Sequence, residues 1–222
     1  MLIAMAGLPG SGKSTLACEL GRYLSAPVLS VDPVEAALWR VGIDRSEPTG
    51  LAAYVAVEAM AADILALSQT VIVDAVNDAE EAREQWRGLA ERQGTPLVWI
   101  EVVCSDPELH RRRLEGRQRN LPDFPEPAWD SLAARRDGMA TWNDERLVLD
   151  SVQGLEANMG IAADHLRKAR VLERAQQTFS RDAGLLGRLA ADERTSQQGA
   201  DVRAVARKIA AEDAELLRRL TE

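Results

Sequence analysis

The fold is decided by residues 2–15, which read Leu2-Ile3-Ala4-Met5-Ala6-Gly7-Leu8-Pro9-Gly10-Ser11-Gly12-Lys13-Ser14-Thr15. The first five residues form an apolar run that is typical of a buried strand. The residues from Gly7 to Ser14 match the pattern G-x-x-x-x-G-K-[ST], and a helix is expected from Lys13 to Leu24. Glycines let successive backbone N–H groups converge on phosphate oxygens, and the helix N-terminus adds its dipole. The stretch predicts a phosphate-binding loop between a strand and a helix.

The loop predicts a site for a nucleoside triphosphate. Lys13 is expected to reach the β- and γ-phosphates during catalysis, and the hydroxyl of Ser14 is expected to bind Mg²⁺. ATP is the expected nucleotide and GTP the alternative, because no base-reading motif is visible. The predicted nucleotide-binding residues are Gly7, Gly10, Ser11, Gly12, Lys13, Ser14 and Thr15.

Short apolar runs alternate with helical patterns along the first 168 residues. This alternation predicts a doubly wound α/β domain with a parallel sheet, which binds ligands at the carboxyl ends of its strands. Further strands are expected at 28–31, 71–73, 97–103 and 147–149, and further helices at 33–41, 51–68, 79–92, 107–119, 129–140 and 155–168.

The tail from residue 169 to 222 has no strand signal. Two amphipathic helices are expected there, at 169–192 and 201–220, with a polar turn between them. They predict a helical hairpin as a C-terminal extension of the 1–168 domain. The hairpin either packs on its own domain or joins two copies of the chain as a homodimer.

Two carboxylates are expected near the phosphates. Asp32 closes the second predicted strand, where it is a candidate general base that accepts a proton from an attacking hydroxyl. The alternative for Asp32 is an N-cap before Pro33, and both roles are compatible. Asp74 ends the third predicted strand, which resembles a Walker B strand, so Asp74 is a candidate Mg²⁺ ligand or a strand-end cap.

Five arginines lie on the helix predicted after the fourth strand. Arg113 and Arg117 are four residues apart and share a helix face, so they are favoured to contact phosphates during transfer. The alternative is a solvated basic face. The proline-rich segment 120–127 that follows is predicted to be a mobile loop, which favours a moving lid.

The acceptor is expected beside the segment that follows Asp32. Candidates for contacting it are Trp39, Arg40 and Tyr54, with Asn77 from the loop after the third strand. One aromatic ring among charged groups indicates a polar, ring-containing small molecule. A core position remains the commoner explanation for Trp39, and Asn77 is equally suited to shaping its turn.

These motifs together resemble the P-loop kinase families related to chloramphenicol phosphotransferase, zeta toxin, shikimate kinase and the kinase domain of polynucleotide kinase. The resemblance covers residues 1–168 and rests on residues 7–15, 31–32, 71–77 and 104–119. It implies a five-stranded sheet of order 2-3-1-4-5, Asp32 as the base, the arginine helix as a lid, and adenine near residues 150–154. Such chains are often labelled AAA family ATPases, although no second small helical domain with sensor arginines is visible.

Composition narrows the function classes. The formal net charge is −8, which disfavours a long nucleic acid as the substrate. No run of about 18 apolar residues is present, so no membrane span is expected, and the cytoplasm is the expected location. The leading hypothesis is an ATP-dependent phosphotransferase acting on a hydroxyl of a small molecule. The alternatives are a regulatory or interaction NTPase without kinase activity, and a polynucleotide 5′-hydroxyl kinase.

Overall fold

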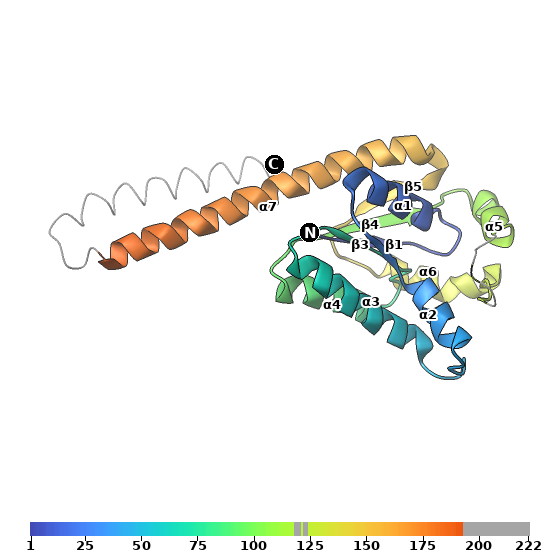
Figure 1. Cartoon of the computed structure of the whole chain (residues 1–222). Coiled ribbons are helices and arrows are strands. Elements are labelled where there is room, and N and C mark those ends of the chain that lie inside the picture. The colour runs from blue at the N-terminus through green and yellow to red at the C-terminus, as the bar shows by residue number, and fades with distance from the viewer. Residues whose placement is uncertain (118–120, 122–123, 193–222) are drawn as a thin grey trace. The chain divides into compact units, whose positions relative to one another are not determined.

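A computed structural model describes residues 1–117, 121 and 124–192 (Figure 1). Five strands form one parallel sheet in the order β2-β3-β1-β4-β5, which confirms the expected fold and strand order. The strands are β1 (Leu2–Ala6), β2 (Val28–Ser30), β3 (Val71–Asp74), β4 (Leu97–Val103) and β5 (Leu147–Asp150).

Helices connect the strands and cover the sheet (Figure 1). Two short 3₁₀ segments, Trp129–Leu132 and Ser151–Gln153, precede α6 and α7. The helices are α1 (Lys13–Leu24), α2 (Val31–Arg40), α3 (Thr49–Ala66), α4 (Glu80–Arg92), α5 (Pro107–Glu115), α6 (Ala133–Ala140) and α7 (Leu155–Asp192).

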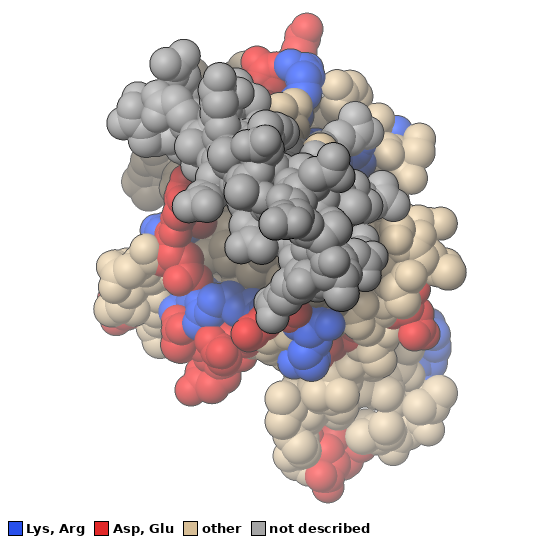
Figure 2. All heavy atoms as spheres, turned by 90° about the vertical axis from the view of Figure 1, so that its left-hand side faces the viewer, with Lys and Arg blue, Asp and Glu red and all other residues tan. Residues whose placement is uncertain are grey.

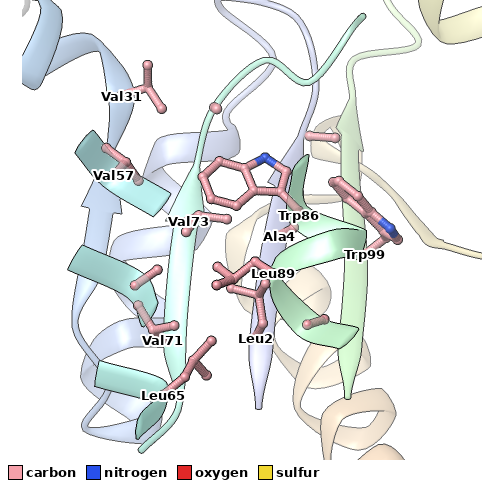
Figure 3. Packing of buried hydrophobic residues seen from close by; sticks show 14 of the residues in the cluster. Leu2, Ala4, Val31, Val57, Leu65, Val71, Val73, Trp86, Leu89 and Trp99 are labelled. Carbon is pink, nitrogen blue, oxygen red and sulfur yellow. The ribbon is translucent and has the colours of Figure 1, made fainter. Parts of the chain in front are cut away.

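The core on one face of the sheet is built from alternate strand residues and from α3 and α4. Figure 3 shows Trp86 and Leu89 of α4 packed over Leu2 of β1 and Val73 of β3. The Trp86 ring is fully buried, and such large aromatic surfaces dominate core energetics. This core fixes the carboxyl ends of β1 and β3, where the phosphate loop and Asp74 begin the candidate site.

Burial in the core accounts for only part of the apolar composition of helix α3. By length and composition it is the one helix among the described residues that would be able to cross a membrane, and 28% of that window is buried. Its buried residues Ala53, Val57, Ala61 and Leu65 belong to the core cluster. Other positions of the helix expose apolar side chains, such as Leu51 and Val55.

The helix after β5 differs from the prediction. Two adjacent helices were predicted, at 155–168 and 169–192, but α7 is continuous from Leu155 to Asp192. The chain divides into two compact units, residues 1–166 and 167–222. The second predicted tail helix and the turn before it lie outside the described residues, so the hairpin and its role in dimerisation stay predictions.

Candidate functional site

The phosphate loop leaves β1 and approaches two other elements closely. Gly7 has φ 136°, and a Cβ there would lie 2.3 Å from the carbonyl oxygen of Val102 on β4. Gly10 has φ 84°, and a Cβ there would lie 3.1 Å from the Cβ of Leu114 on α5. Both positions therefore require glycine. The loop ends at Lys13, the first residue of α1, so the expected anion-binding helix N-terminus is present.

A cavity of about 490 Å³ lies beside this loop. It brings together all four predicted catalytic residues, although they come from distant parts of the sequence. The side chains that the argument uses are Lys13, Ser14 and Thr15 of α1, Asp32 of α2, and Arg113 and Arg117 of the α5 region.

Lys13 and Asp74 form a buried ion pair at the base of the site. The ammonium of Lys13 donates to Oδ1 of Asp74, and the Ser30 hydroxyl donates to Oδ2 at 3.1 Å. Burial alone would raise the pKa of Asp74, but Lys13 and hydrogen bonds from Ser14 and Ser30 hold it below its ordinary value. Asp74 therefore stays ionised at neutral pH.

The donor set at this point suits the predicted metal. The carboxylate of Asp74 and the hydroxyl of Ser14 lie within hydrogen-bond reach of each other. Mg²⁺ binds oxygen ligands of this kind, usually one or two from the protein with the remainder from phosphates and water. The residues present therefore fit a Mg²⁺ site.

The position of Asp32 differs from the prediction. β2 ends at Ser30 and α2 begins at Val31, so Asp32 lies in the first turn of the helix and does not close the strand. The N-cap position belongs to Ser30, so the N-cap interpretation of Asp32 is wrong. From the first turn the half-buried carboxylate still lines the cavity of the phosphate loop.

The arginine helix is shorter than predicted. α5 ends at Glu115, and the N–H of Gly116 caps it by donating to the carbonyl of Arg112 at 2.9 Å. Arg117 therefore lies beyond the helix and does not share a helix face with Arg113. Both still line the cavity, and Arg119 lies outside the described residues.

Partners within the chain hold both cavity arginines in place. Nη1 of Arg113 donates to the Ser151 hydroxyl at 2.7 Å. Nη1 of Arg117 lies 3.4 Å from Oε2 of Glu126. Arg111, by contrast, pairs with Glu115 on the exposed side of α5, as expected for a solvated face.

The turn after β5 lies next to the phosphate loop. A Cβ added at Gly12 would meet the Cβ of Ser151 at 3.4 Å. Asp150 fixes this turn, because its Oδ1 accepts from the N–H groups of Ser105 and Val152, both at 3.1 Å. This is the turn for which the resemblance implies contact with adenine.

None of the four acceptor candidates Trp39, Arg40, Tyr54 and Asn77 lines the cavity. The indole N–H of Trp39 donates to the Thr49 hydroxyl at 2.9 Å, and its ring stacks on Phe124 with centroids 4.9 Å apart. The guanidinium of Arg45 lies 4.7 Å from the Trp39 ring centre. Trp39 thus joins the α2–α3 connection to the segment before α6. Arg40 is exposed at the end of α2.

Asn77 shapes its turn, which is the alternative role that the sequence left open. It is fully buried and has φ 55°. Its Nδ2 donates to the carbonyl of Met5 at 2.7 Å, and its Oδ1 accepts from the Trp86 indole at 2.9 Å. Both ends of the amide are therefore engaged inside the protein, and substrate contact by this side chain would break these bonds.

Asp78 and Arg135 complete a polar cluster that sequence reasoning missed. Nε of Arg135, on α6, lies 3.7 Å from Oδ2 of Asp78, which follows Asn77. Burial raises the pKa of the Tyr54 phenol, and the charges of Asp78, Asp32 and Arg135 also act on it. Asp32, Asp78 and Arg135 therefore all lie within electrostatic reach of the Tyr54 phenol. The position of Asp78 just after a strand end was the available signal.

Residues 2–139 match the model of the AAA domain family. The chain belongs to this family. The match spans the phosphate loop, α2, β3, α5 and nearly all of α6, and thus contains every site residue described above except the turn after β5. Comparison with curated proteins found no match.

Solved structures share the fold of this AAA domain protein at low sequence identity. Kti12 from Chaetomium thermophilum, solved with ADP-AlF₃, is 22% identical with a TM-score of 0.54, over 74% of this chain and 98% of that one. The APS kinase CysC from Mycobacterium tuberculosis, solved with AMPPNP and APS, is 18% identical with a TM-score of 0.53, over 75% and 96%. A gluconokinase from Sinorhizobium meliloti is 17% identical with a TM-score of 0.53, over 79% and 95%.

Proposed function

We propose that this protein transfers the γ-phosphate of ATP to a hydroxyl of a small molecule, with Asp32 as the base. One observation carries the proposal: a single cavity holds the carboxylate of Asp32 together with Lys13, Arg113 and Arg117. A nucleotide-hydrolysing switch needs the cationic groups but not a carboxylate placed for an acceptor. Two of the proteins with this fold are named as kinases of small molecules, which agrees with the proposal.

In the proposed transfer, different residues bind the phosphates, hold the metal ion and stabilise the transferred group. The N–H groups of the loop and the ammonium of Lys13 bind the β- and γ-phosphates, which requires Lys13 to exchange Asp74 for phosphate oxygens. Ser14 and Asp74 would hold Mg²⁺, which supplies positive charge to the phosphate oxygens when it is bound. Arg113 and Arg117 stabilise the charge that spreads over the transferred group.

Asp32 acts on the acceptor side. Its carboxylate accepts the proton of the attacking hydroxyl as the new O–P bond forms and the bond to the β-phosphate oxygen breaks. The acceptor then leaves as a phosphate monoester, and ADP remains in the loop.

The polar cluster beside Asp32 indicates the acceptor class. Asp32 and Asp78 are hydrogen-bond acceptors, whereas Arg135 and the Tyr54 phenol donate. A small molecule with several hydroxyl groups satisfies this set. On the face shown in Figure 2, which is turned away from the phosphate loop, acidic and basic side chains are intermingled among the coloured residues.

The test is a screen of polyols, sugars, hydroxy acids and nucleosides with purified protein and γ-labelled ATP. The proposal predicts label transfer to one hydroxyl compound class, and no transfer by Lys13→Ala. Hydrolysis of ATP that no compound accelerates or diverts would favour a regulatory NTPase. Saturable labelling of a 5′-hydroxyl oligonucleotide alone would favour a polynucleotide kinase.

A further inference from the structure

A second cavity, of about 360 Å³, lies on the β4 side of the phosphate loop. We call it the β4 chamber. It shares only Leu8 with the lining of the nucleotide cavity, and it contains neither Asp32 nor the arginines of the α5 region. Its size suits a small organic molecule and is near the lower limit of typical ligand sites. The polar residues that line it are Ser11, Glu101, His110, Arg136 and Arg146.

Ser11 provides the strongest sign that this chamber takes a ligand. The residue is 1% exposed, and its hydroxyl has no hydrogen-bond partner among the described residues. A buried hydroxyl without a partner costs about 1–3 kcal/mol, and native structures rarely leave one unsatisfied. A molecule in the chamber would supply the missing partner.

The charges around the chamber define what that molecule carries. Glu101 is 7% exposed and accepts from Nε of Arg146 at 2.6 Å, so these two charges offset each other. The guanidinium of Arg136 lies 4.4 Å from the Trp129 ring centre and makes no ion pair within the described ranges. Arg136 is exposed at the mouth of the chamber, and the lining has one more positive than negative side chain. The planar fork of arginine suits a carboxylate.

His110 connects the chamber to the phosphate loop. Its Nε2–H donates to the carbonyl of Pro9 at 2.8 Å, and its ring packs edge-on against Trp129 with centroids 5.1 Å apart. Because a carbonyl only accepts, this bond fixes the proton on Nε2. In the neutral ring Nδ1 is then an acceptor, and it suits a hydroxyl as donor.

We propose that the β4 chamber binds a small hydroxycarboxylate as a second ligand, separate from the nucleotide. Its carboxylate pairs with Arg136, and its hydroxyl groups bond to Ser11 and to the oxygens of Glu101. The proposal stands on Ser11, the charge balance and the separate cavity, so it does not depend on the kinase activity proposed above.

The chain offers a direct reporter, because His110 and His165 are its only histidines. Protein labelled with ¹³C-histidine is titrated with D-glycerate, with propionate, which lacks hydroxyls, and with glycerol, which lacks charge. Each titration is repeated with saturating Mg-ADP, because the phosphate loop itself attracts anions. Comparison with His165→Gln assigns the two imidazole signals. In the wild type, the His165 signal then serves as the internal control.

The proposal predicts a saturable shift of the His110 signal with D-glycerate that persists in Mg-ADP. Propionate should bind more weakly, and glycerol should give no shift. Arg136→Met should raise the apparent Kd for D-glycerate at least about tenfold, because a charged hydrogen bond is lost, while Arg22→Met, at an exposed position of α1, should not. No shift with D-glycerate would mean that the chamber holds water only. The proposal would also be overturned if Mg-ADP abolished the shift of the His110 signal or if glycerol produced an equal shift. The same holds if the apparent Kd for D-glycerate were unchanged in Arg136→Met.

Discussion

The ammonium of Lys13 is paired with the carboxylate of Asp74, 61 residues away in the chain, and their side chains are only 10% and 5% exposed. The pair joins the first residue of α1 to the last residue of β3. A buried pair of this kind is costly to break from one side, because the remaining charge keeps its desolvation cost. Under the proposed function, a bound triphosphate would relieve that cost by offering Lys13 phosphate oxygens and leaving Asp74 to Mg²⁺.

Lys13→Met should weaken nucleotide binding. Loss of charged hydrogen bonds to phosphate should raise the Kd for Mg-ADP by about ten- to a hundredfold. Isothermal titration calorimetry measures the change. Lys168→Met, at another of the three lysines, should leave the Kd unchanged. An unaltered Kd in Lys13→Met would show that the loop does not bind the phosphates.

Asp74→Asn should destabilise the free protein. It leaves the buried ammonium of Lys13 uncompensated, so the free energy of unfolding should fall by about 3–5 kcal/mol. The double variant Lys13→Met/Asp74→Asn should be more stable than Asp74→Asn alone, because neither charge remains. Urea unfolding of the four proteins closes the cycle, and strictly additive effects would contradict the coupling.

Asn77→Ala should mainly lower the stability of the fold. It removes the bonds to the Met5 carbonyl and the Trp86 indole, and each buried group left unpaired costs about 1–3 kcal/mol. Thermal unfolding should show a clear loss, whereas Asn143→Ala at an exposed position should show almost none. A variant that unfolds like the wild type but loses acceptor affinity would instead place Asn77 in the substrate site.

His110 should make the fold sensitive to mild acid. Burial lowers its pKa below 6.5, and the charges of Arg136 and Arg113 lower it further, against the bond to Pro9. Well above pH 6.5 the ring is neutral in both folded and unfolded chains. As pH falls below 6.5, the unfolded chain takes up the proton first, so stability decreases until the folded pKa is passed.

The matched variant for this effect is His110→Gln, whose amide N–H can still donate to Pro9. It should lose less stability than the wild type between about pH 7.5 and pH 5.5, measured by urea unfolding. His165→Gln should keep the wild-type dependence. The same slope in wild type and His110→Gln would contradict the assignment of the titration to His110.

Local features of the sequence predicted the sheet and the phosphate side of the site. Apolar runs and the glycine spacing determine where β1, the loop and α1 lie, and the structure confirms these elements. The phosphate-binding roles of the loop residues stay predictions. The helix predicted after β4 is too long, because Gly116 caps α5 and ends it at Glu115. The division into two helices at Lys168 was wrong, and no proline lies between residues 155 and 192 to enforce one.

The acceptor side was harder to predict because it depends on tertiary packing. Asp78 and Arg135 come from different elements, and no local pattern joins them. Trp39 looked like a candidate by composition, but its partners, Thr49 and Phe124, hold it elsewhere. Asn77 was correctly placed in the loop after β3, yet only the structure shows that both ends of its amide are used.

The most direct test of the proposed transfer is the rate of phosphoryl transfer from ATP to the acceptor in a single turnover. Asp32→Asn should reduce this rate by about 10²–10⁴-fold, the usual contribution of a general base, while the Kd for Mg-ADP stays within about twofold. Asp63→Asn, on the exposed side of α3, should transfer at the wild-type rate. Unchanged transfer in Asp32→Asn would contradict the account.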